Sequence, residues 1–98
     1  MRRVDFVFCI GFEGSTAIID GGMMRRHASR TPRQLAESGL FKQAVCAAVS
    51  ATAPAEHLQE VLAVYNQKAA TPVGSSEALE RMFGVAGIPE GVKKVTVV

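Results

Sequence analysis

Strand-like sequences lie at the two ends of this chain, and helix-like sequences fill its middle. The segment "VDFVFCI" (4–10) is rich in β-branched and aromatic residues, and "VKKVTVV" (92–98) alternates valine with polar residues. Residues 54–69 carry apolar side chains at the i, i+3, i+4 and i+7 spacing of an amphipathic helix. This distribution predicts an α+β fold, in which a small sheet is built from segments far apart in the sequence.

The first strand is apolar on both of its predicted faces. Phe6, Phe8 and Ile10 would point to one side, and Val7 and Cys9 to the other. Both sides of such a strand need cover, so we expect it to be central in the sheet or covered twice.

A hairpin is predicted after this strand, followed by a segment of ambiguous structure. The glycines of "GFEG" (11–14) indicate a turn, and "STAII" (15–19) is typical of the returning strand. The segment "MMRRHASR" (23–30) is expected to be a loop or an edge strand, with a short helix as the alternative.

The clearest local signal is the helix start "TPRQLAE". Thr31 can cap the helix, Pro32 suits its first position, and Gln34 completes a T-x-x-Q capping box. The helix is predicted over 32–51, with a kink or a two-helix break near Gly39.

Two more helices are predicted. The apolar face of the helix starting at Pro54 is expected to consist of Leu58, Val61, Leu62, Tyr65 and Ala69. A shorter helix over 77–83, "EALERMF", is capped by Ser75 or Ser76 and stopped by Gly84.

These elements predict one domain, residues 1–98, with the order β-β-α-α-α-β. We expect a two-layer arrangement in which the N- and C-terminal strands are adjacent in a three-stranded sheet and helices cover one face. Apolar surface left uncovered on such a sheet favours self-association, so a homodimer is predicted.

The net charge and the cysteine content limit the classes of function that the sequence favours. The net charge is +2, weaker than the basic excess of most dedicated nucleic-acid domains. The cysteines, Cys9 and Cys46, both lie in apolar surroundings, which favours buried free thiols and a cytoplasmic protein. No apolar run approaches the length of a membrane span.

The basic segment is the one candidate binding site. Between Asp20 and Glu37 the chain has no acidic residue and carries five basic or titratable side chains. They are Arg25, Arg26, His27, Arg30 and Arg33. They could contact the phosphates of a nucleic acid or another polyanion, or they could be a solvated connector whose arginines pair with Glu37, Glu56 or Glu60.

Three other motifs are weaker. The turn Gly11–Gly14 lacks the glycine–lysine pattern of a phosphate-binding loop, so a small-ligand site there is the least favoured hypothesis. Residues 31–49 resemble a helix-turn-helix, but the would-be recognition helix carries only Lys42 and Gln43 as long polar side chains. His57 and Glu60 are too few for a metal site.

The sequence therefore favours a small interaction or regulatory domain that binds protein, including a second copy of itself. Nucleic-acid or polyanion binding through residues 25–33 is the alternative. No pattern of catalytic residues, cofactor ligands or metal ligands is found, so we do not expect an enzyme.

Overall fold

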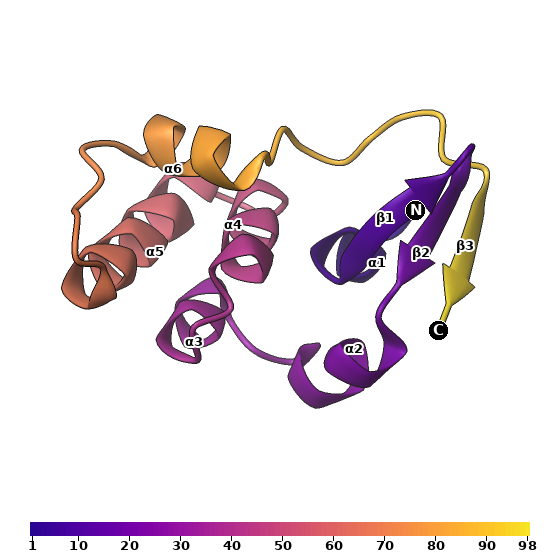
Figure 1. The fold of residues 1–98 in the computed structure, drawn as a ribbon, viewed down its shortest axis with the longest axis horizontal. Coiled ribbons are helices and arrows are strands. Elements are labelled where there is room, and N and C mark those ends of the chain that lie inside the picture. Colours follow the sequence, from indigo (N-terminus) through magenta and orange to yellow (C-terminus); the bar gives the residue numbers. More distant parts are fainter. The chain divides into compact units, whose positions relative to one another are not determined.

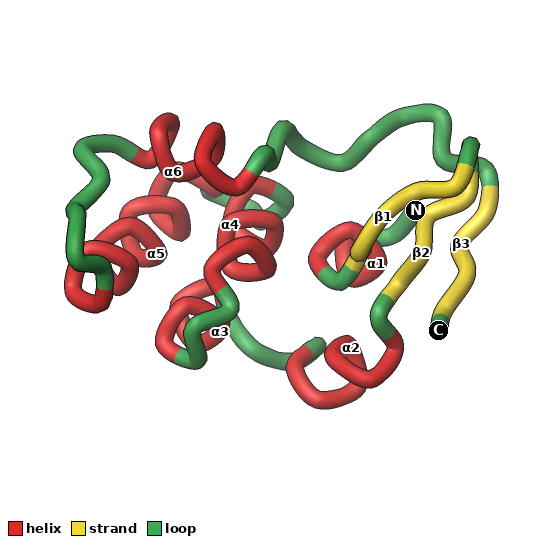
Figure 2. Tube along the Cα trace, viewed as in Figure 1, coloured by secondary structure: helices red, strands yellow, loops and turns green.

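The computed structural model describes residues 1–98 and confirms an α+β fold with a three-stranded sheet (Figures 1 and 2). The elements are α1 (Arg3–Val7), β1 (Cys9–Glu13), β2 (Thr16–Ile19), α2 (Gly21–His27), α3 (Pro32–Glu37), α4 (Phe41–Val49), α5 (Pro54–Lys68), α6 (Ser76–Phe83) and β3 (Lys94–Val97). The chain divides into two compact units. Residues 1–29 and 88–98 form the sheet unit, and residues 30–87 form the helical unit.

The middle strand of the sheet is β2, so the predicted adjacency of the first and last strands is wrong. The order is β1-β2-β3, with β1 antiparallel and β3 parallel to β2. In the β1–β2 hairpin, strand β1 pairs with one edge of β2 and leaves the other edge of β2 free. The C-terminal strand takes that free edge, after the long connection between Ile19 and Lys94 has brought the chain back to run parallel to β2.

The N-terminal segment differs from the prediction as well, because α1 replaces the first half of the strand expected over 4–10. Asp5 closes this helix start by accepting hydrogen bonds from the backbone and the side chain of Arg2. Strand β1 begins only at Cys9 and runs through residues that were predicted to be the turn. Local capping by a buried carboxylate thus outweighs the β preference of the valine and phenylalanine residues.

A two-residue turn joins β1 to β2. Glu13 pairs with Thr16, and Gly14 between them has a φ of 61°. Ser15 has no positive φ, so the turn has the pattern with glycine at its first central position that suits a tight hairpin. Further along β1 the register shifts between Cys9 and Gly11, which leaves Ile10 as the extra residue of a β-bulge.

The segment after the hairpin is a helix, not the loop or edge strand that was favoured for 23–30. Asp20 is the N-cap of α2, and its carboxylate accepts a hydrogen bond from the backbone N–H of Met23. The methionines and arginines that follow are good helix formers, so the helix continues to His27. The short-helix alternative is the correct one.

The helical unit begins with the predicted capping box, and the predicted break near Gly39 is confirmed. Thr31 and Gln34 exchange the two capping hydrogen bonds. Gly39 has a φ of 81°, and the backbone N–H of Leu40 donates to the carbonyl of Leu35. This is the Schellman geometry that ends a helix at a glycine, so the expected long helix becomes α3 and α4.

Helix α4 is the centre of the helical unit and packs against α3, α5 and α6. Five of its consecutive residues, 44–48, are buried. On α5 the buried residues are Leu58, Val61 and Val64, whereas Leu62 is only half-buried, so the apolar face of this helix is rotated from the predicted one. No helix of the structure combines the length and the apolar character that a membrane crossing requires.

Candidate functional site

Three of the five predicted binding residues lie on α2, in the sheet unit. Arg25 and Arg26 are exposed, and neither guanidinium has a hydrogen bond or an ion pair. Both side chains run back along the helix, so a Cβ placed on Gly21 would lie 3.2 Å from an Arg25 nitrogen. His27 is half-buried, and its Nδ1 atom is buried without a hydrogen-bond partner.

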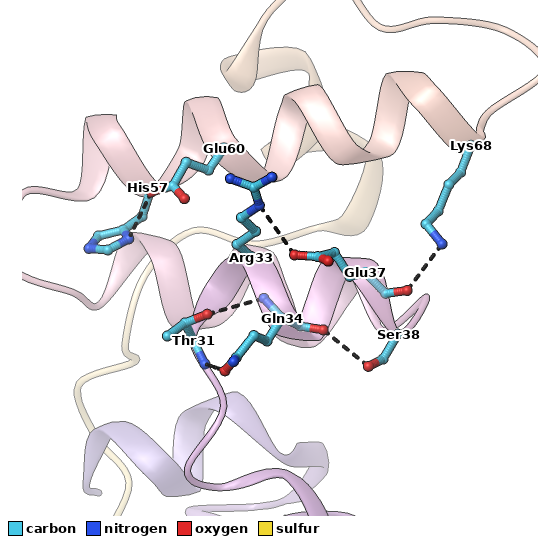
Figure 3. A network of polar contacts seen from close by, with 8 residues as sticks. All are labelled: Thr31, Arg33, Gln34, Glu37, Ser38, His57, Glu60 and Lys68. Atoms are coloured by element: carbon cyan, nitrogen blue, oxygen red, sulfur yellow. Dashed lines mark hydrogen bonds and ion pairs between the residues drawn. The ribbon is translucent and has the colours of Figure 1, made fainter.

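The other two binding residues lie in the helical unit and have polar partners; Figure 3 shows that of Arg33. Arg30 donates from Nη1 to the hydroxyl of Ser38 at 2.7 Å, and Arg33 donates from Nε to the carboxylate of Glu37 at 3.2 Å. The Arg33–Glu37 pair is exposed on both sides, so it contributes only about 0.3–0.5 kcal/mol to stability. Its main effect is to offset the charge of Arg33.

Lysine and serine side chains complete this polar network around α3. Lys68 on α5 donates from Nζ to the backbone carbonyl of Glu37 at 3.0 Å, and Ser38 donates to the carbonyl of Gln34 (Figure 3). These bonds bind α3 to α5 and satisfy carbonyls at the end of α3. The network is therefore structural in character.

The predicted basic segment is thus divided between the two units. Arg25, Arg26 and His27 belong to the sheet unit, and Arg30 and Arg33 belong to the helical unit. Of the four arginines, one is paired with a predicted acidic partner, Glu37, and none is paired with Glu56 or Glu60. The connector interpretation holds for Arg33, whereas Arg25 and Arg26 keep free charges that an anion could contact.

Exposed apolar side chains gather on the sheet unit. Six of the seven large exposed apolar residues of the chain belong to it. They are Ile10, Phe12, Ile88, Val95, Val97 and Val98. The seventh, Met82, lies on α6.

The pairing of the strands places several of these side chains on one face of the sheet. Phe12, Ala17 and Val95 form one cross-strand row, and Ile19 and Val97 are paired two positions along. The central residues Ala17 and Ile19 are fully buried, whereas Phe12 and Val97 are 52% and 50% exposed. The face is therefore covered at its centre and open at both edge strands. The alternation in "KVTV" was the signal for this face in the sequence.

The outer edge of β3 also carries unpaired backbone groups. The amides of Lys94 and Val98 donate to the carbonyls of Ser15 and Ile19, so these residues face β2. Because alternate residues of a strand turn their N–H and C=O groups to opposite edges, Val95 and Val97 direct theirs away from β2. All four residues of β3 are exposed, and the strand lies at the edge of the sheet (Figure 1).

The weaker motifs of the sequence show no site. On the polar side of α5, Nδ1 of His57 lies 3.7 Å from Oε1 of Glu60. No three histidine, cysteine or acidic side chains come together as metal ligands would. Cys46 is buried and Cys9 is half-buried, and neither forms a disulfide. In the helix-turn-helix interpretation α4 would be the recognition helix, but it is buried among the other helices, which base readout does not permit.

Comparisons with protein-family models, with curated proteins and with solved structures found no match to this chain.

Proposed function

We propose that this chain is a small protein-interaction domain that associates with a second copy of itself through the sheet unit. The observation that supports the proposal is the concentration of exposed apolar side chains on that unit. Large exposed apolar side chains that lie together on one surface are typical of protein interfaces, whereas scattered ones are normal on any surface.

The test is the molar mass of the purified chain in solution, measured by light scattering and sedimentation over a range of concentrations. We expect a dimer mass for the wild-type chain and a shift towards monomer for Val97→Lys, because a charge at this half-exposed position would have to be buried in the interface. Met82→Lys is the matched control, since Met82 is 48% exposed and lies on the helical unit. If Val97→Lys and Met82→Lys changed the molar mass in solution equally, the result would contradict the proposal.

A second function, binding of nucleic acid or another polyanion, is supported by the two unpaired arginines of α2. We expect binding to generic duplex and single-stranded nucleic acid to weaken as salt rises, because each neutralised phosphate releases counterions. Arg25→Ala with Arg26→Ala should reduce the slope of log affinity against log salt by about 2, given about 0.9 per phosphate contact.

The control for this second function is Arg33→Ala, because the charge of Arg33 is already offset by Glu37. The double substitution on α2 should change the free energy of unfolding by less than about 0.5 kcal/mol, as at other exposed positions. Undetectable binding at low salt would exclude this function and leave Arg25 and Arg26 as solvated charges.

A further inference from the structure

We infer that two copies of this chain join by antiparallel pairing of their β3 strands, so that a six-stranded sheet runs through the dimer. The inference rests on the proposed self-association and names the surface and the register. It starts from the outer edge of β3, where Val95 and Val97 direct their backbone N–H and C=O groups away from β2. An exposed strand edge of this kind is a template for another strand.

The edge is complementary to itself. When a two-fold axis perpendicular to the sheet passes at Thr96, Val95 of one copy lies opposite Val97 of the other. Both residues direct their backbone groups outward, so each such pair exchanges both of its amide–carbonyl hydrogen bonds. An axis at Val95 makes fewer of these bonds, because it sets Val97 opposite Lys93, whose amide already donates to the carbonyl of Ser15.

Charge and side-chain pairing favour the same register. The charged residues of this strand region, Lys93 and Lys94, lie at its beginning, and antiparallel pairing carries them to opposite ends of the interface. In a parallel pairing the lysines of the two copies would lie side by side, which is destabilising. At the axis Thr96 would meet Thr96 of the other copy, a favourable cross-strand pair.

The pairing also extends the partly open apolar face. Val95 and Val97 share a face with Phe12, Ala17 and Ile19. The two-fold axis keeps this face on the same side in both copies, so the valines of one β3 pack beside those of the other. The exposed fractions of Val95 and Val97, 38% and 50%, would therefore decrease in the dimer.

A cysteine placed at the axis tests the register directly. In a non-hydrogen-bonded antiparallel pair the Cα atoms are about 4.5 Å apart, within the range that a disulfide spans. We expect Thr96→Cys to cross-link two copies under mild oxidation, with the bond located by peptide mass spectrometry at the introduced cysteine. Lys94→Cys is the control, because four residues of offset put its two copies about 13–14 Å apart.

A proline in β3 tests the backbone hydrogen bonds independently. Val95→Pro removes an N–H that faces away from β2, and proline is tolerated at such edge positions. We expect the dimer dissociation constant to rise at least about tenfold, the effect of losing one hydrogen bond in each of the two Val95–Val97 pairs. Val95→Thr keeps the N–H and a β-branched side chain, so its dissociation constant should stay close to the wild-type value.

The outcomes separate the two proposals. The β3–β3 interface is supported if Thr96→Cys cross-links two copies and Lys94→Cys does not, and if Val95→Pro weakens the dimer and Val95→Thr does not. A dimer that Thr96→Cys does not cross-link and Val95→Pro does not weaken would overturn this interface and leave self-association through another surface. A monomer at every concentration would overturn both proposals. Should Val95→Pro fail to fold, the cross-linking result decides.

Discussion

Gly21 is the residue at which the backbone of the sheet unit leaves the least room. A Cβ at this position would lie 2.6 Å from Cγ1 of Val97 and 2.8 Å from the carbonyl oxygen of Val98. The amide of Gly21 donates to that same carbonyl at 2.9 Å. The start of α2 is therefore packed directly on the end of β3, and only glycine fits there.

This contact predicts a difference between two adjacent glycines. We expect Gly21→Ala to lower the free energy of unfolding by about 1–3 kcal/mol, as overpacking does in other cores. Gly22→Ala is the control, because its Cβ would meet only the ends of side chains, those of Arg26, Asp20 and Arg25, at 3.4 Å, 3.5 Å and 4.0 Å. It should be neutral or stabilising by up to about 1 kcal/mol, since alanine favours the helix. Chemical denaturation measures both variants. Equal losses of unfolding free energy for Gly21→Ala and Gly22→Ala would show that the contact with β3 does not require glycine at position 21.

Asp5 predicts a dependence of stability on pH. Burial alone would raise the pKa of this carboxyl group, but the hydrogen bonds and the charge of Arg2 outweigh that effect and lower its pKa below the ordinary value. A group with a lowered folded pKa stabilises the protein above its unfolded pKa of about 3.9, and the stabilisation is lost as the pH falls through the folded value.

We therefore expect the wild-type chain to be more stable than Asp5→Asn at neutral pH, and the difference to shrink as the solution is acidified. Denaturation with urea from about pH 6 to about pH 3 measures it, because this range covers the onset of the loss. A difference that does not change over this range would contradict the role of the ionised carboxylate.

Single residues with a strong backbone preference were the most predictable part of the chain. The Thr31–Gln34 box, the Ser75 cap and the glycines at 39 and 84 all act as their sequence patterns predicted. Asp20 was missed because the two glycines after it also indicate a turn, and an aspartate serves as an N-cap or as a turn residue equally well.

At the scale of elements, the rotated face of α5 gives a direct test of its packing. Leu58 is buried and Leu62 is half-buried on the same helix. We expect Leu58→Ala to cost about 2–5 kcal/mol of unfolding free energy, the usual range for a buried leucine, and Leu62→Ala distinctly less. Because both variants replace leucine by alanine on the same helix, helix propensity changes equally in the two and does not contribute to the difference. A larger loss for Leu62 would contradict the rotated face.

Element type was predicted well where the periodicity extends over several turns, and poorly where the element is short. The helix Pro54–Lys68 was predicted to within a residue, and the strand Lys94–Val97 lies inside its predicted range. Helix α1 has only five residues, and its apolar sequence suits a strand equally well, so the capping of its start by Asp5 and Arg2 is what favours the helix.

At the scale of the whole molecule, the sequence could not predict which strand would pair with β3, because either edge of the hairpin accepts a third strand. It could not show the division of the basic segment either, since clustering of arginines along the chain says nothing about unit boundaries. The pairing of Arg33 with Glu37 was predictable, because the two residues are four apart on one helix.

Self-association predicts that thermal stability depends on protein concentration. For a chain of this length that unfolds from a dimer, a tenfold rise in concentration should raise Tm by roughly 3–4 °C, from the average unfolding entropy per residue. Differential scanning calorimetry at two concentrations measures this shift. A Tm that is independent of concentration would be the result for a monomer.

The sequence separation of β2 from β3 has a consequence for how the chain acquires its structure. Strand β3 is synthesised only after the whole of residues 30–87, so until then the sheet consists of a hairpin, and an isolated hairpin is marginally stable. The helical unit closes mostly local contacts and should form early, whereas the β2–β3 pairing closes a long loop and should form late. During that interval the free edge of β2 is open to other chains, so a slowly synthesised nascent chain is at its most aggregation-prone just before β3 emerges.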